Sequence, residues 1–183
     1  MTTRKICLSS FLLLILFSFR DAGRPSVHKR FFHRTPEGEV YIVVIKSHYE
    51  LQLFDKDGWY ATYPVVFGEK TLEDKMMEGD RKTPEGTYHI TRKRPHEKWY
   101  EIMDLDYPTA ADYAKFNERK SRGQIPRSAK IGDGIAIHGT WPHDDIAVDA
   151  YQNWTNGCVS LKREDMEEVY NLAPVGTRVE IQH

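Results

Sequence analysis

The sequence predicts a mostly-β domain with a few short helices. Most of its segments are short runs rich in β-branched and aromatic residues, bounded by Gly and Pro, which is typical of strands joined by turns. Only two segments show helical spacing, and they do not alternate with strands as a βαβ repeat would. With 183 residues, the chain is long enough for one domain with a sizeable core.

The first half of this domain is predicted to be a hairpin followed by another strand. Residues 40–47 (VYIVVIKS) are rich in β-branched side chains and indicate a buried strand. Residues 48–55 alternate apolar and polar side chains, as a half-buried strand does. Gly58 can then adopt the positive φ of a hairpin turn. A return strand, a loop rich in Gly and Pro, and a further strand are predicted at 59–68, 79–86 and 87–93.

The second half is predicted to hold two helices among three short strands. Thr109 is a suitable N-cap for a helix within residues 107–123, with an acidic residue three positions on. Residues 162–173 place apolar side chains at helical spacing, and Pro174 ends that pattern. The strands are predicted at 135–137, after a glycine-rich turn, at 158–161 and at 177–182.

The N-terminus is typical of an export segment. Arg4 and Lys5 precede an apolar run over residues 6–19, which is the charge pattern of a signal peptide. We therefore expect residues 1–22 to be a signal peptide or an N-terminal membrane anchor, residues 23–39 a linker, and residues 40–183 the folded domain. Export is expected, with possible membrane attachment through the apolar segment.

Composition narrows the possible functions. The net charge is -1, so the sequence lacks the excess of basic residues that is typical of nucleic-acid-binding proteins. His138, His143 and Cys158 are the residues to consider for a metal, but their spacing fits no zinc pattern of paired ligands. We therefore expect no metal site.

Cys158 and His138 are the residues most suited to chemistry. Gly157 allows a sharp turn that presents backbone N–H groups near the sulfur, as an acyl-transfer oxyanion needs. His138 follows a short apolar run, where it could act as a general base that shifts the thiol toward thiolate. The alternatives are a buried structural cysteine and a strand-end histidine with ordinary hydrogen bonds.

Four aromatic residues are candidates for a substrate groove near this pair. Trp141, Trp154, Tyr107 and Tyr63 could line a groove for a peptide or a sugar. The alternative for each of them is packing in the core.

These segments resemble the catalytic domain of the L,D-transpeptidase (YkuD) family. The most specific likeness is IHGT at 137–140 together with NWTNGCVSL at 153–161, which resemble the family's histidine and Gly-Cys motifs. The stretches KTPEGTYHI, DYPTAADYAKF and IGDGIAIHG are similar to other parts of that domain. The resemblance extends over about residues 40 to 182.

The resemblance implies a β-sandwich with a cysteine nucleophile that acts on peptidoglycan stem peptides outside the cytoplasmic membrane, in the periplasm or on the outer face of that membrane. Cys158 would form a thioester with loss of D-alanine, and a second stem would resolve it into a 3→3 cross-link. His138 would move the proton, the Gly139 carbonyl would orient the imidazole, and N–H groups near Gly157 would hold the oxyanion. No metal or organic cofactor would be required. The alternatives are a hydrolase with the same residues (an L,D-carboxypeptidase, or an amidase that releases a wall-attached protein) and a non-catalytic wall-binding domain.

The candidate motif also departs from the common form of the family. Thr155 replaces a serine, and Ser160 stands where arginine is common. Arg163, Lys162 or Arg127 could hold the acyl donor's carboxylate in its place. The residues expected to contact substrate are Thr155, Asn156, Trp141, Trp154, Tyr107 and Arg127.

Overall fold

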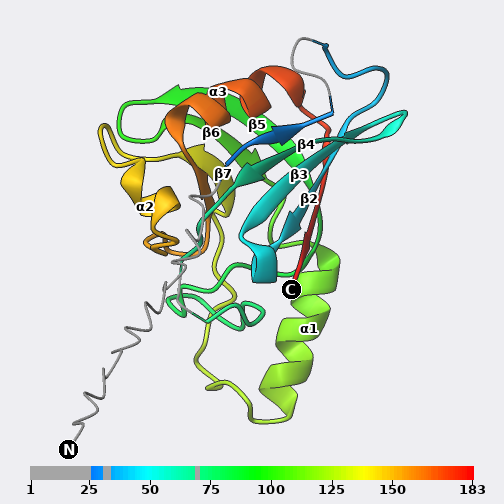
Figure 1. Cartoon of the computed structure of the whole chain (residues 1–183). Coiled ribbons are helices and arrows are strands. Elements are labelled where there is room, and N and C mark those ends of the chain that lie inside the picture. Colours follow the sequence, from blue (N-terminus) through cyan, green and yellow to red (C-terminus); the bar gives the residue numbers. More distant parts are fainter. Residues whose placement is uncertain (1–25, 31–33, 69–70) are drawn as a thin grey trace, which may run out of the picture.

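The computed structural model describes residues 26–30, 34–68 and 71–183. Within these ranges, nine strands are hydrogen-bonded to one another in a single sheet (Figure 1). The strands are β1 His28–Lys29, β2 Tyr41–Ile45, β3 Glu50–Asp55, β4 Gly58–Pro64, β5 Gly86–His96, β6 Tyr100–Leu105, β7 Ala136–Gly139, β8 Val159–Leu161 and β9 Arg178–Gln182. The helices are α1 Ala110–Ser121, α2 Ile146–Asp149, α3 Arg163–Leu172 and a 3-10 turn at Lys46–His48. The predicted mostly-β class is confirmed.

The order β1-β4-β3-β2-β9-β5-β6-β7-β8 divides into two halves that share the long strand β5. The β2–β9 and β7–β8 pairs are parallel, and the other neighbours are antiparallel. One core joins both halves, because Ile42 and Leu53 of one half cluster with Met103 and Leu161 of the other, all of them fully buried. Helix α3 packs on β6 and β7, while α1 projects from the opposite end (Figure 1).

Local sequence signals account for much of this structure. Gly58 has a φ of 102°, which only glycine adopts without strain, and the hairpin turns there. Thr109 caps α1 in a capping box, since its hydroxyl accepts from the Asp112 N–H and the Asp112 carboxylate accepts from the Thr109 N–H. Both features follow the expectation from the sequence.

Two strands lie where the sequence analysis placed none. β6 carries the acidic residues Glu101 and Asp104 at half-buried positions, which obscures its strand pattern, and Arg92 on β5 pairs with Asp104 at 2.9 Å. β1 is only two residues long and pairs with β4. It lies within residues 23–39, where the sequence predicts a linker. The strand expected at 135–137 runs over Ala136–Gly139, so His138 lies inside it.

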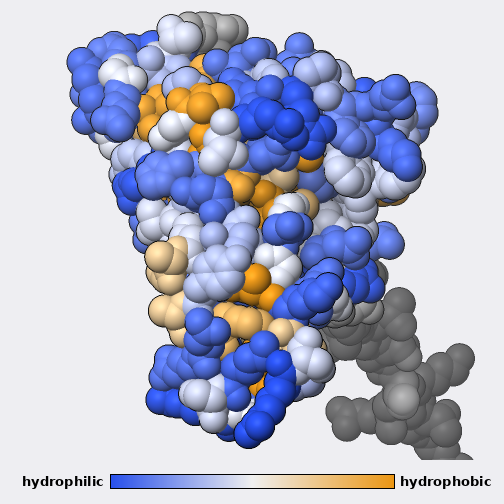
Figure 2. Space-filling model, turned by 180° about the vertical axis from the view of Figure 1, so that it is seen from behind, coloured by the Kyte–Doolittle hydropathy of each residue, from blue (hydrophilic) through white to orange (hydrophobic). Residues whose placement is uncertain are grey.

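The surface seen from behind in Figure 2 is mostly hydrophilic, with some apolar patches. Among the described residues, Trp141, Ile146 and Tyr151 are exposed apolar side chains from the one segment that joins β7 to β8. No helix in the described ranges combines the length and the apolar character needed to cross a membrane. The expected signal or anchor at 1–22 lies outside those ranges.

Candidate active site

His138 lies on β7, and Cys158 directly precedes the neighbouring parallel strand β8. In the β7–β8 pair, His138 lies opposite Ser160 and Ile137 opposite Val159. Cys158 directly precedes β8, and side chains two residues apart on a strand share a face. Cys158, Ser160 and His138 are therefore expected to face the same side. The thiol donates a hydrogen bond to the carbonyl oxygen of Gly134, at 3.5 Å, just before β7.

The ring of His138 has a defined tautomer. Its Nδ1 lies 2.8 Å from the carbonyl oxygen of Gly139. Since a carbonyl oxygen can only accept, Nδ1 must carry the proton, and in the neutral ring Nε2 is the nitrogen that can accept one. The Gly139 carbonyl thus has the contact that the family resemblance implied for it.

His138 is only 1% exposed, and aromatic rings enclose its side chain. Trp99 stacks on the imidazole with ring centroids 4.8 Å apart and 23° between the planes. Trp154 meets it edge-on at 5.5 Å, and His96 also stacks on Trp99, with ring centroids 4.4 Å apart. The sequence analysis missed Trp99, because it lies in the turn before the unpredicted strand β6.

Trp141 and Trp154, both predicted to contact substrate, lie together beside this enclosure. Their ring centroids are 6.4 Å apart, and the Lys98 ammonium lies 5.5 Å from the Trp141 ring centroid. Trp141 is 41% exposed, so it presents an aromatic surface to solvent close to the histidine enclosure.

Thr155 stabilises the turn that carries the cysteine. Its hydroxyl donates to the Cys158 carbonyl oxygen at 2.7 Å and accepts from the Gly157 N–H at 3.2 Å. Thr155 is buried, which suits it to holding the turn, whereas Asn156 is exposed. The Gly157 N–H could therefore hold an oxyanion only by giving up its bond to Thr155.

The chain that follows β4 holds the same turn from its other side. The Phe67 carbonyl oxygen accepts from the N–H groups of Trp154 and Thr155, at 2.9 and 3.1 Å. At Gly68 the backbones approach so closely that an added Cβ would lie 2.2 Å from the Arg81 carbonyl oxygen and 2.5 Å from the Gly157 nitrogen. Gly68 is a site-supporting residue that the sequence analysis did not identify.

We expect Gly68→Ala to destabilise the fold by about 3 kcal/mol, since the methyl group would collide with rigid backbone atoms on two sides. Urea unfolding measures this. Gly123→Ala is the matched control, because its Cβ would meet open space and only its φ of 68° opposes the change. Equal losses in the two variants would contradict the tight packing argued for Gly68.

Both candidate catalytic groups are neutral near pH 7. Burial raises the pKa of the Cys158 thiol to about 11, against a partial opposing effect of a hydrogen bond with the Ala136 backbone. Burial likewise lowers the pKa of His138 to about 4. Desolvation thus disfavours both charges in the resting site, whereas the sequence analysis expects the imidazole to shift the thiol to thiolate.

Tyr107 and Tyr63 belong to the core. The Tyr107 hydroxyl donates to the Ile131 carbonyl oxygen at 3.2 Å, and its ring meets Tyr88 edge-on at 6.0 Å. Tyr63 is fully buried. The core-packing alternative thus describes the position of both better than a substrate groove does.

Other candidates lie at the surface. Arg127, on the segment between α1 and β7, is exposed, as is His143 after β7. Within the described part of the chain, no three His, Cys, Asp or Glu side chains are grouped so as to hold a metal ion.

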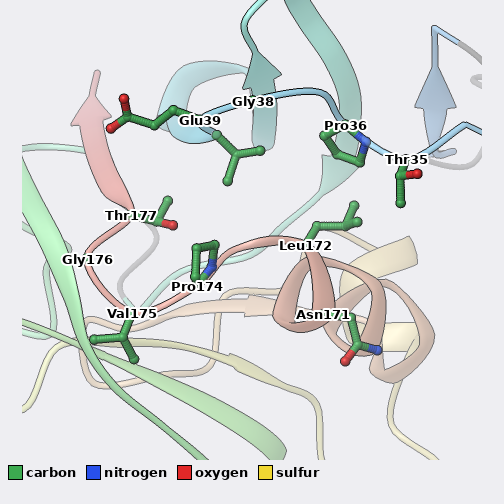
Figure 3. A pocket seen from close by; sticks show the side chains of 11 residues that line it. Thr35, Pro36, Gly38, Glu39, Asn171, Leu172, Pro174, Val175, Gly176 and Thr177 are labelled. Carbon is green, nitrogen blue, oxygen red and sulfur yellow. The ribbon is translucent and has the colours of Figure 1, made fainter.

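The surface hollow in Figure 3 lies away from these residues. It has a volume of about 500 Å³ and lies between residues 35–40 and the end of α3. Leu172, Pro174 and Val175 contribute its apolar wall, and none of the predicted site residues lines it.

Comparison with known proteins gives consistent matches. The sequence profile of the L,D-transpeptidase catalytic domain (YkuD) matches residues 29–181. The "Putative L,D-transpeptidase YafK" of Escherichia coli strain K12 is 25% identical over 181 residues, 92% of this chain and 63% of that protein. The "Putative L,D-transpeptidase YqjB" of Bacillus subtilis strain 168 is 26% identical over 146 residues, 78% of this chain and 70% of that protein.

The fold has solved counterparts. The helical cell shape determining protein Pgp2 from Campylobacter jejuni superposes with a TM-score of 0.60 at 21% identity, over 89% of this chain and 52% of that one. The chain thus spans 63% of the length of YafK and about half of that of Pgp2. Because the family profile matches most of its length, the chain belongs to the L,D-transpeptidase catalytic domain family.

Proposed function

We propose that this protein is a cysteine-dependent L,D-transpeptidase that forms 3→3 cross-links between peptidoglycan stem peptides. The observation that carries the proposal is the arrangement on β7 and β8. A thiol precedes one strand, and the adjacent strand holds an imidazole whose protonated Nδ1 is fixed by Gly139. Family membership supports the same chemistry.

In the proposed reaction, the Cys158 sulfur attacks the amide carbon between the L-centre of the diamino acid and D-alanine. Nε2 of His138 accepts the thiol proton as the carbon–sulfur bond forms. The carbon–nitrogen bond then breaks, the imidazolium returns the proton to the leaving D-alanine amine, and a thioester remains. An amine from a second stem attacks this thioester and loses a proton to His138. The carbon–sulfur bond then breaks, and the imidazolium returns the proton to the sulfur, which restores the free thiol.

The neutral resting pair suits this sequence of steps. A thiol with a pKa of about 11 is stable until substrate arrives, and a histidine with a pKa of about 4 is an unprotonated base at neutral pH. Proton transfer then accompanies attack instead of preceding it. We further propose that the protein acts outside the cytoplasmic membrane, in the periplasm or on the outer membrane face, since its substrate is located there.

A muropeptide assay tests the function. The purified protein is incubated with tetrapeptide-containing muropeptides. The products are separated, and their masses are measured by mass spectrometry. New 3→3 dimers with released D-alanine are expected. Shortened monomers without dimers would indicate that water resolves the thioester, and the protein would be an L,D-carboxypeptidase. Release of a wall-attached protein would indicate the amidase alternative. The absence of any change in the muropeptides would favour the alternative of a non-catalytic wall-binding domain.

A further inference from the structure

In the proposed reaction, the buried imidazole of His138 becomes positively charged when it accepts the thiol proton. Within the described part of the chain, no carboxylate lies at ion-pair distance from it, and the histidines that have such a neighbour are His48, His89 and His183. Its Nδ1 faces the Gly139 carbonyl oxygen at 2.8 Å, which carries only a partial negative charge. A buried charge without a full counter-charge is costly unless another group stabilises it.

The indole ring of Trp99 is well placed to stabilise this charge. It stacks on the imidazole with ring centroids 4.8 Å apart and 23° between the planes. The face of an indole ring carries a negative electrostatic potential and attracts a cation that lies within about 6 Å of its centroid. The stacked geometry therefore suits an imidazolium as well as a neutral imidazole.

Contacts on both sides of the turn between β5 and β6 fix the position of Trp99. Its carbonyl oxygen accepts from the Gly139 N–H at 3.0 Å, and its own N–H donates to Nδ1 of His96 at 3.3 Å. The next residue, Tyr100, has a φ of 63°, which is strained for a non-glycine residue and persists only where surrounding contacts impose it. Gly139 thus binds Nδ1 of His138 through its carbonyl oxygen and holds Trp99 through its N–H.

The other groups around His138 offer its positive charge little support. Ile102 on β6 and Ser160 on β8 are its partners across the sheet, and neither side chain is ionisable. The thiol of Cys158 is neutral near pH 7. The charge of His96 acts in the unfavourable direction, because it lowers the pKa of His138. Besides the Gly139 carbonyl, the face of the Trp99 ring is thus the favourable contact for an imidazolium.

We propose that Trp99 is a positioning residue that holds the imidazole of His138 in place and stabilises the imidazolium through the face of its indole ring. The ring acts on the histidine in two opposite ways. By excluding water it lowers the pKa of His138, whereas attraction between its face and a positive charge raises that pKa. The contribution to turnover rests on the proposed transpeptidase function, whereas the effect on the pKa of His138 does not.

Fluorinated tryptophan at position 99 separates the two effects, because fluorine withdraws electron density from the ring face and hardly changes the size of the ring. The full chain is prepared with tryptophan, a monofluorotryptophan or tetrafluorotryptophan at this position. NMR of labelled imidazole gives the pKa of His138, with His138→Gln identifying its signal. We expect this pKa to fall by about one unit from tryptophan to tetrafluorotryptophan. Acylation by a carbapenem at about pH 7 should slow about fivefold in the same order, since only part of a change in basicity reaches the transition state.

The matched control is the same series at position 59. Trp59 lies on β4 and donates its indole N–H to the Thr62 hydroxyl at 2.8 Å, so its fluorination should change neither the pKa of His138 nor the rate. Trp99→Phe keeps an aromatic face and should retain the rate of acylation within about threefold, whereas Trp99→Met fills the space without such a face and should slow it about tenfold. If circular dichroism shows that Trp99→Met does not fold, the fluorinated series carries the test.

A pKa of His138 that stays constant or rises along the series at position 99 would overturn the proposal, because the ring would then act only by excluding water. A falling pKa with an unchanged rate would overturn the role in turnover, because no imidazolium would form in the slow step. A protein in which the pKa falls as expected, but which yields neither dimers nor shortened muropeptides, would refute the proposed function and leave the effect of Trp99 on His138 intact. The two failures are thus distinguishable.

Discussion

Cys158→Ala is expected to abolish the acyl-enzyme and to reduce product formation on the order of 10⁴-fold or more, since the thioester cannot form without the sulfur. Intact mass after incubation with a tetrapeptide stem gives the direct readout. The wild-type protein should gain the mass of the acyl group after loss of D-alanine, and the variant should gain nothing.

Two controls make this prediction specific. Cys7→Ala removes the other cysteine of the sequence and should leave the adduct unchanged. Cys158→Ser preserves size and hydrogen bonding but replaces the thiol by a poorer nucleophile, so the turn held by Thr155 should fold as before while acylation is lost. Undiminished dimer formation by Cys158→Ala would remove the cysteine from the mechanism and favour a different nucleophile.

The sequence could predict the elements of this site better than their arrangement. The β-branched run ending at His138 and the short run after Cys158 both indicate strands, because alternation and composition are local properties. Their parallel pairing is not local. It brings together residues twenty positions apart, and the contacts that stabilise it come from β6 and from Val66, which forms a bridge with Ser160.

The surroundings of the candidate catalytic pair could not be predicted for a related reason. Trp99 stacks on His138 only because β6 pairs with β7, and the acidic residues of β6 hide that strand in the sequence. The protonation states depend on the same packing, since desolvation follows from what covers a group and no sequence motif specifies it. Sequence motifs thus suffice to select the two candidate residues, whereas their protonation states depend on tertiary packing.

His138→Gln is expected to slow acylation by 10²- to 10⁴-fold, the usual contribution of a general base. An electrophile such as a carbapenem serves as the probe, and the rate is measured against pH. Because the pKa of His138 is lowered to about 4, the base is lost only as pH falls through that value, so the wild-type rate should rise through about pH 4 and stay nearly constant from pH 6 to 9.

The variant should show a different profile, not merely a lower rate. Without a base, only thiolate reacts, and its fraction rises tenfold per pH unit while pH is below the thiol pKa of about 11. Glutamine is preferred to alanine because it largely fills the space between Trp99 and Trp154, which limits solvent entry. A variant with a flat profile at the wild-type rate would mean that His138 only packs among these rings. A steep profile in the wild type as well would mean that the thiol ionises before attack, and the neutral-pair mechanism would be wrong.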